Sequence, residues 1–210
     1  MCFSSQASFV AGVTLIMISL ASVHRVYKVR KMQLLPLALT PLLFGIQQLL
    51  EGALWLGLLA SPRNETLYAI GLHGFVWFSM FWWPTWLPFA LAWAETNLLF
   101  KRVMYALSFA GAVLGAYLVW PPYAAEIVHN HIAYTAGHTS LMLFALYLVT
   151  GIVPFFISSL PLMWFVGILG YVSLLVTLLA YFIWTTSIWC FFVAIISSGM
   201  YMFIRHITAR

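Results

Sequence analysis

The chain has 210 residues, of which 64% are apolar, 18% are aromatic and only 6% are charged. A soluble domain carries roughly 25% charged residues, so this composition excludes a water-soluble enzyme, a disordered tail and a nucleic-acid-binding protein. Nine Lys and Arg residues outnumber four acidic ones. In membrane proteins such a surplus collects on the cytoplasmic side. We therefore expect an integral membrane protein whose main partner is the lipid bilayer, with no nucleic acid among its partners.

Seven apolar stretches are long enough to form membrane-spanning helices, each of which needs ~20 residues. They cover residues 4–23, 34–60, 67–93, 103–120, 132–157, 162–181 and 186–204. The second, third and fifth stretches contain prolines, which are expected to kink these helices. The predicted fold class is an all-α integral membrane bundle of seven transmembrane helices, formed as a single domain over residues 1–210.

The basic residues predict the orientation of this bundle. Eight of the nine Lys and Arg residues fall in the first connection, the third connection and the C-terminal tail, and only Arg63 falls elsewhere. Because basic residues are retained on the cytoplasmic side, the N-terminus is predicted outside and the C-terminus in the cytoplasm.

Glu51 is the one acidic or basic residue that this topology does not explain. It lies roughly 13 Å inside the second stretch at ~1.5 Å per residue, where a carboxylate costs ~2.5 kcal/mol or more. Thr40, Gln47, Gln48 and Glu51 form one polar seam at helical spacing, and Trp55 continues it outward. The carboxyl either binds an ion or a small ligand in an outward-facing cavity, or stays neutral and hydrogen-bonds neighbouring helices.

A metal site is an alternative interpretation of the intramembrane polar residues. His73 in the third stretch and His138 in the fifth lie at a depth similar to that of Glu51, and His131 shares a helix face with His138. Two His and one carboxylate are the ligand set of many catalytic zinc sites, and they also suit iron or copper. The competing interpretation is a set of hydrogen bonds between helices.

The third stretch is crowded with aromatic residues. Trp82, Trp83 and Trp86 lie near its centre around Pro84 and Pro88, where an interfacial aromatic belt does not explain them. They either pack a kinked helix or line an aromatic pocket for a sterol, quinone, polyene or cation.

Small and sulfur-containing residues suggest further contacts. Gly111 and Gly115 permit close helix packing, and a homo-oligomer formed through them is one possibility. Cys2 and Cys190 are either joined in a disulfide or are two separate apolar thiols.

Several motifs are similar to those of a bacterial membrane-protein family of unknown function that opens with the pattern MCFSxxASF. The resemblance rests on residues 1–4, 7–9 and 43–48, Glu51, Gly52, Trp55, the step Trp83-Pro84 with Pro88 and Glu95, and Pro154 with Ser158 and Ser159. It implies an inner (plasma) membrane location in a bacterium and carries no activity.

Three functions therefore remain open. The first is a sensor or transporter that handles a small ligand or ion in an outward-facing cavity. The second is a membrane metalloenzyme that activates a water on a bound metal, and the third is an accessory subunit of a larger membrane complex. The residues expected to form the cavity are Glu51, Gln47, Gln48, Trp55, Trp82 and Trp86. The residues expected to hold a metal are Glu51, His73 and His138.

Overall fold

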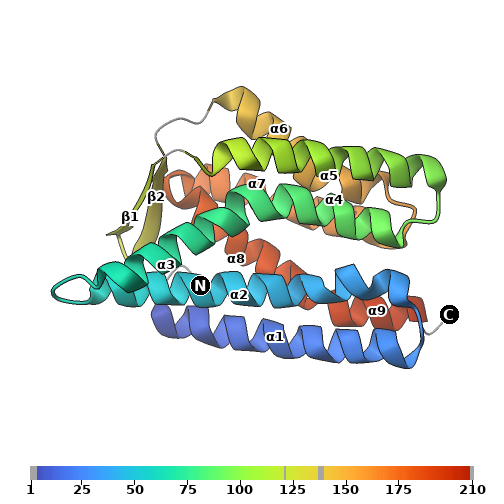
Figure 1. Ribbon diagram of the computed structural model, residues 1–210, viewed down its shortest axis with the longest axis horizontal. Coiled ribbons are helices and arrows are strands. Elements are labelled where there is room, and N and C mark those ends of the chain that lie inside the picture. Colours follow the sequence, from blue (N-terminus) through green and yellow to red (C-terminus); the bar gives the residue numbers. More distant parts are fainter. Residues whose placement is uncertain (1–3, 121, 137–139, 209–210) are drawn as a thin grey trace.

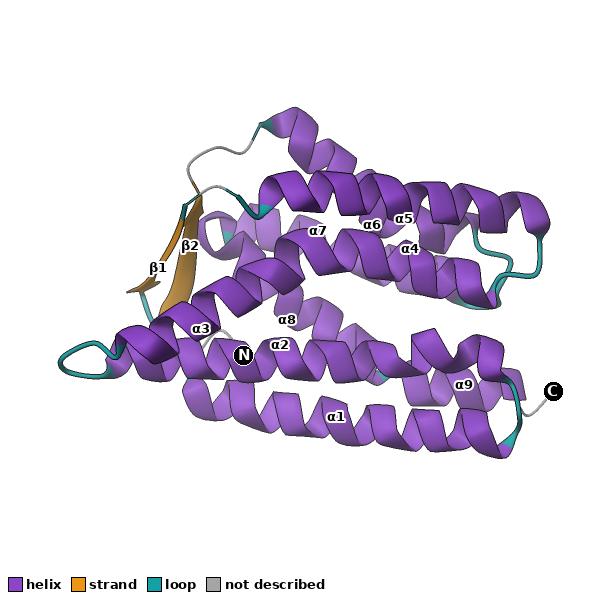
Figure 2. Ribbon diagram, in the orientation of Figure 1, coloured by secondary structure: helices purple, strands orange, loops and turns teal. Residues whose placement is uncertain are grey.

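The computed structural model describes residues 4–120, 122–136 and 140–208, which form continuous helical segments and one β-hairpin (Figures 1 and 2). Most of the helices lie along the long axis of the molecule. The helical segments are α1 (Ser5–Lys28), α2 (Leu35–Leu59) after the 3-10 turn η1 (Met32–Leu34), α3 (Glu65–Val76) continuing through the π-helical η2 (Trp77–Trp82) into α4 (Trp83–Ala94), α5 (Leu98–Leu118), α6 (Leu141–Ile157), α7 (Met163–Ala180), and the 3-10 turn η3 (Phe182–Trp184) continuing into α8 (Thr185–Ser198) and α9 (Met200–Thr208).

Five of the described helices are long and apolar enough to cross a membrane. They are Ser5–Lys28, Met32–Leu59, Leu98–Leu118, Met163–Ala180 and Phe182–Thr208. The other two predicted spans correspond to the combined α3–η2–α4 segment, which a π-helical turn interrupts, and to α6, which has 17 residues. The protein is therefore mostly helical, and its long apolar helices indicate contact with a lipid bilayer.

Local sequence signals explain where several helices begin. Ser4, Asn64, Asn97 and Ser140 each precede a helix and accept a hydrogen bond from one of its first backbone amides. Ser and Asn side chains at this position satisfy amides that have no partner within the helix.

The start of the predicted fifth span is wrong. Residues 123–136 form an antiparallel hairpin of β1 (Tyr123–Val128) and β2 (His131–Ala136), in which Val128 pairs with His131, and α6 begins only at Leu141. The turn residues His129 and Asn130 have φ angles of 48° and 63°, as a two-residue hairpin turn requires. A short apolar run does not distinguish a strand from a helix. His131 is therefore on a strand and shares no helix face with His138, which lies outside the described residues.

The two ends of the bundle differ in character. One end of the bundle carries the α1–α2 connection, the α4–α5 connection and the C-terminus of α9, and we call it the basic end (Figure 1). We call the opposite end the hairpin end. Arg25 donates a hydrogen bond to Thr208 at 3.1 Å, and Lys31 donates one to the Ile207 carbonyl at 3.0 Å. These contacts hold the C-terminal helix against the first connection.

A buried carboxylate also ties two connections together at the basic end. Glu95 accepts hydrogen bonds from the Thr96 and Asn97 amides, both at 2.9 Å. It also accepts bonds from the Ser158 hydroxyl and from the amide and hydroxyl of Ser159. The α4–α5 connection is thereby fixed to the α6–α7 connection.

Gly111 and Gly115 pack helices within the chain. A Cβ atom at Gly111 would lie 1.9 Å from the Pro84 carbonyl oxygen, and one at Gly115 would lie 2.6 Å from the Phe81 Cα. The two glycines therefore let α5 approach η2 and α4, and this packing occupies the face through which we expected a second copy of the chain to bind.

Candidate functional site

The site is organised around a π-helical turn in the middle of the molecule. The Trp83 amide donates to the Phe78 carbonyl, five residues earlier, instead of to Ser79 as in an α-helix. The next residue, Pro84, has no N–H to donate. The Ser79 carbonyl thus lacks both of these backbone donors, and the Tyr147 hydroxyl of α6 donates to it instead at 2.5 Å. A side chain of α6 thereby supplies the hydrogen-bond donor that the Ser79 carbonyl lacks within its own helix.

Four side chains form a buried hydrogen-bonded cluster beside this turn, which we call the Gln47 network: Gln47, Ser79, Trp83 and Cys190. The Gln47 amide donates to the Ser79 hydroxyl at 3.1 Å and to the Cys190 sulfur at 3.4 Å, and it accepts from Trp83 Nε1 at 2.6 Å. Gln47 is fully buried. The network joins α2, η2, α4 and α8, so it fixes the centre of the bundle.

Glu51 lies one helical turn beyond Gln47 on α2 and is 0% exposed. The Ser187 hydroxyl of α8 donates to its carboxylate at 2.5 Å, and Gln48 also interacts with it. Ser187 and Cys190 are three residues apart, so they share a face of α8. The Glu51–Ser187 and Gln47–Cys190 bonds therefore hold the same two helices together at successive turns.

The central tryptophans have different environments. Trp83 stacks on Phe44 with ring centroids 3.7 Å apart. Trp86 stacks on Trp82 and donates to the Thr40 hydroxyl at 3.1 Å. The packing of these rings accounts for the crowding of aromatic residues around Pro84 in the sequence.

Trp55 is buried in an apolar cluster near the hairpin end with Leu54, Leu72 and Ile132. Its indole N–H, like that of Trp82, has no hydrogen-bond partner among the described residues.

Three cavities are lined by residues of α6, α7 and α8, to which α2 and α4 add residues in two of them and η2 and α5 in the third. The hairpin-end cavity has a volume of about 650 Å³, the central cavity about 60 Å³ and the basic-end cavity about 410 Å³. The central cavity shares Tyr147, Trp189 and Cys190 with the hairpin-end cavity. It shares Phe44, Leu87, Phe155, Val166, Val193 and Ile196 with the basic-end cavity. The three are therefore neighbours in one row.

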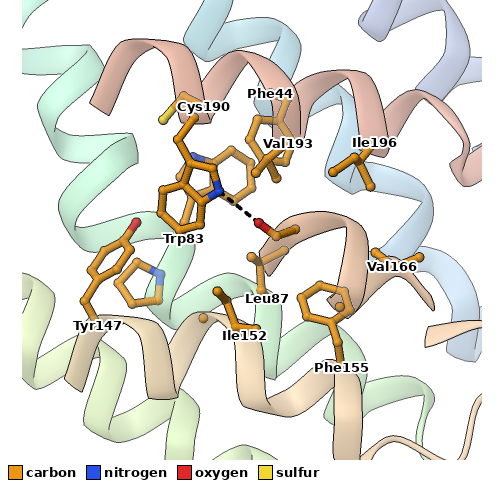
Figure 3. Close-up of a pocket in the computed structure, with 15 residues that line it drawn as sticks. Phe44, Trp83, Leu87, Tyr147, Ile152, Phe155, Val166, Cys190, Val193 and Ile196 are labelled. Carbon is orange, nitrogen blue, oxygen red and sulfur yellow. Dashed lines mark hydrogen bonds between the residues drawn. The ribbon is translucent and has the colours of Figure 1, made fainter. Parts of the chain in front are cut away.

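Figure 3 shows the central cavity, with Tyr147, Ile152 and Phe155 contributed by α6 and Cys190 and Val193 by α8. The hydrogen bond drawn there runs from Trp189 Nε1 to the Gly170 carbonyl at 3.3 Å and links α8 to α7.

Two glycines keep the central cavity open. Gly151 on α6 and Gly170 on α7 both line it, and a Cβ atom added to either would meet nothing within 4 Å. Gly111 is needed for a close contact between helices, whereas Gly151 and Gly170 are not. Because glycine has no side chain, the space beside these two residues belongs to the cavity.

A family model described as "Family of unknown function (DUF6629)" matches residues 1–210. The chain belongs to DUF6629. No curated protein and no solved structure matches the chain. Function in this DUF6629 member must therefore be inferred from its own residues.

The cavity expected around Glu51 stays a prediction. None of the three cavities of this DUF6629 chain is lined by the residues expected to form it, Glu51, Gln47, Gln48, Trp55, Trp82 and Trp86. Beside Glu51, the Ser187 hydroxyl of α8 donates a hydrogen bond to its carboxylate. Cys190 and Trp189 line both the hairpin-end and the central cavity, and Trp83 lines the central cavity.

The predicted metal ligands are not brought together in the described part of the chain. His73 is exposed on α3, whereas Glu51 is fully buried, and the third expected ligand, His138, lies outside the described residues. Residues 4–120, 122–136 and 140–208 contain no group of three or more His, Cys, Asp or Glu side chains placed to hold a metal ion. Cys190 is a free buried thiol, and Cys2 lies outside the described residues.

Sequence reasoning did not single out Tyr147, Ser187 or Trp189 of this DUF6629 member. Tyr147 and Ser187 lie in apolar helices as ordinary polar residues, and their partners are far away in the sequence. One feature of the sequence was informative about the site. Pro84 lies five residues after Ser79, so in a π-helical turn it has no N–H to donate to the Ser79 carbonyl.

Proposed function

We propose that this DUF6629 protein binds a small, largely apolar molecule within the membrane, as a sensor or transporter. The observation that carries the proposal is the row of three neighbouring cavities, all of which are lined by α6, α7 and α8. The two larger cavities have volumes of about 650 and 410 Å³ and open at the surface beside exposed apolar residues such as Leu141 and Met202. A small apolar molecule could therefore enter them from the surrounding bilayer, and pockets of this size and lining are typical of ligand sites.

The Gln47 network supports this site. Ligand pockets are mostly apolar and contain a few placed polar groups that orient the ligand. Cys190 and Tyr147 line both the hairpin-end and the central cavity, and hydrogen bonds to Gln47 and Ser79 hold them in position. The site thus has a rigid polar wall beside an apolar space.

The same proposal includes an orientation in a bacterial inner membrane, with the seven helical segments as spans. The described Lys and Arg residues other than Arg63 lie near the basic end, and this supports a cytoplasmic location for that end. The N-terminus and the hairpin end then lie outside, so the largest cavity belongs to the outer half of the bilayer.

Native mass spectrometry of the protein purified from its own membrane tests the binding function. We expect a bound small molecule on the wild-type chain. Gly170→Leu, which fills the central cavity, should lose it, whereas Val172→Leu on the lipid-exposed face of α7 should keep it. A wild-type chain that carries no small molecule would overturn the proposal.

Proton or cation handling at Glu51 is a second candidate function. It is favoured by the complete burial of this carboxyl and by its bond to Ser187, since intramembrane carboxyl groups commonly mark ion pathways. Vesicles containing the protein and an entrapped pH dye should respond to an external pH step faster than empty vesicles, and Glu51→Gln should remove the difference. Identical traces for wild-type and empty vesicles would exclude this function.

A further inference from the structure

Basic side chains from two distant parts of the sequence meet at the basic end. Four lie at the end of α1 and in the connection that follows it, and one lies on α9, which packs against α1. Arg25 and Lys31 reach α9 directly through their hydrogen bonds to Thr208 and to the Ile207 carbonyl. The five side chains, which we call the basic patch, are Arg25, Lys28, Arg30, Lys31 and Arg205.

The basic patch has no acidic side chain to neutralise it. The sequence contains four acidic residues. Glu51 is buried within α2, and Glu65 and Glu126 belong to the hairpin end. Glu95 lies at the basic end, but its carboxylate already accepts hydrogen bonds from the two connections that it holds together. Like charges that are held together repel one another, so an anion from outside the chain would stabilise the patch.

Arg30 closes the C-terminus of α1 in a backbone conformation that favours glycine. Its φ angle is 57°, its amide donates to the Tyr27 carbonyl, and the amide of Lys31 donates to the Val26 carbonyl. These are the bonds of a Schellman motif, in which the left-handed residue is usually glycine because a side chain is strained there. The chain therefore carries an exposed cation where a glycine would be less strained.

The exposed face of α1 connects the basic patch to the lipid-facing surface. Val10, Met17 and Leu20 are exposed on this face, and helical spacing continues it to Tyr27 and Lys28, which are exposed as well. At ~1.5 Å per residue the apolar part, residues 10–20, is roughly 15 Å long. One leaflet contributes about half of a hydrocarbon core of ~30 Å. An acyl chain along this face would thus end close to the basic patch.

We propose that the basic patch binds the head group of an anionic phospholipid whose acyl chain lies along the exposed face of α1. The side chains of Lys28, Arg30 and Arg205 are exposed and available to the phosphate. Clusters of Lys and Arg at the end of a transmembrane helix attract anionic lipids, each charge adding to the attraction. The surface lies outside the three cavities, so this inference does not depend on the proposed function.

Lipid binding to the full-length protein in detergent tests this inference. Native mass spectrometry compares phosphatidylglycerol with phosphatidylcholine, both carrying the same acyl chains. We expect phosphatidylglycerol to bind about tenfold more tightly, because only its head group carries a net negative charge. Replacing Lys28 and Arg30 together by glutamine should weaken its binding about fivefold for each charge removed, equivalent to ~1 kcal/mol per charge. Binding of phosphatidylcholine should not change.

Two further variants serve as controls. Replacing Lys101 and Arg102 together by glutamine removes the same charge from the start of α5, and should leave phosphatidylglycerol binding at the wild-type level. Arg30→Gly removes one charge but suits the positive φ angle, so it should fold and still weaken phosphatidylglycerol binding about fivefold. The comparison of the two lipids on the wild-type chain needs no variant.

Each outcome supports or overturns the inference. Equal binding of the two lipids to the wild-type protein would overturn it. If both double variants weaken phosphatidylglycerol binding equally, the charge of the whole basic end attracts the lipid and the basic patch is not a site. If inorganic phosphate at the same concentration displaces phosphatidylglycerol, the ligand is a free anion and not a lipid. Binding of a small molecule in the cavities is unaffected by all three results.

Discussion

The hydroxyl of Tyr147 on α6 donates a 2.5 Å hydrogen bond to the carbonyl of Ser79, a backbone group that the π-helical turn and Pro84 leave without its usual donors. The bond joins the two sides of the cavity row at the boundary between the hairpin-end and central cavities. The same contact therefore stabilises the turn and closes part of the space between two cavities.

Tyr147→Phe should destabilise the protein by ~1–3 kcal/mol, because it leaves a buried carbonyl without a donor while conserving the ring. Thermal unfolding in detergent measures this effect. Tyr171→Phe on the lipid-exposed face of α7 is the matched control and should have little effect. Equal unfolding temperatures for the two variants would contradict the role of the Tyr147 hydroxyl.

Trp83→Phe should cost more stability than Trp82→Phe. The Trp83 indole donates to Gln47 at 2.6 Å, so its loss leaves a buried amide oxygen without that donor, at ~1–3 kcal/mol. The Trp82 indole N–H has no partner among the described residues, so replacement there breaks no such bond. Denaturant or thermal unfolding of both variants makes the comparison. A larger loss of stability for Trp82→Phe than for Trp83→Phe would show that the hydrogen bonds of the Gln47 network are not the main source of stability at this position.

The same substitution should have opposite effects at two glycines. Gly111→Ala places a Cβ atom 1.9 Å from the Pro84 carbonyl and should destabilise the chain by ~1–3 kcal/mol or more. Gly151→Ala meets no neighbour and should stabilise α6 by roughly 0.5–1 kcal/mol, the usual difference between these residues in a helix. The unfolding temperatures of both variants test this prediction. If Gly151→Ala lowers the unfolding temperature as much as Gly111→Ala does, there is no open space beside Gly151.

Glu95 should make stability depend on pH. Burial raises the pKa of this carboxyl, but hydrogen bonds from Ser159, Asn97 and Ser158 outweigh burial and lower it below its ordinary value. A carboxyl with a lowered pKa in the folded state stabilises the protein above its ordinary pKa of ~4.3 and loses this contribution as the pH falls through the lowered value.

Glu95→Gln should accordingly reduce stability at neutral pH by ~1.5–3 kcal/mol, the usual contribution of hydrogen bonds to a charged group. The difference from the wild type should shrink as the pH falls below ~4. Unfolding measured across this pH range tests the prediction, and a difference that does not change with pH would refute it.

The helical segments could largely be predicted from the sequence, because their apolar runs are long and Ser or Asn residues cap several of them. The hairpin could not, since residues 132–136 form a short, partly apolar run close to the following helix, and such a run does not distinguish a strand from a helix. The signal that was overlooked is the pair His129-Asn130, which adopts the positive φ angles of a two-residue turn.

The candidate site was only partly predictable. The spacing of Gln47, Gln48 and Glu51 placed them on one face of α2, and all three are buried. Their partners on α8, Ser187 and Cys190, depend on how distant helices pack, which periodicity does not reveal. The cavities depend on the same packing, and Gln47, Gln48 and Glu51 line none of the three.

An experimental density map of the protein purified from its own membrane, at a resolution that shows side chains, is the most direct test of an intramembrane ligand site. We predict density for a bound molecule in the cavities lined by Tyr147, Trp189 and Cys190. Cavities that contain no such density would contradict the account.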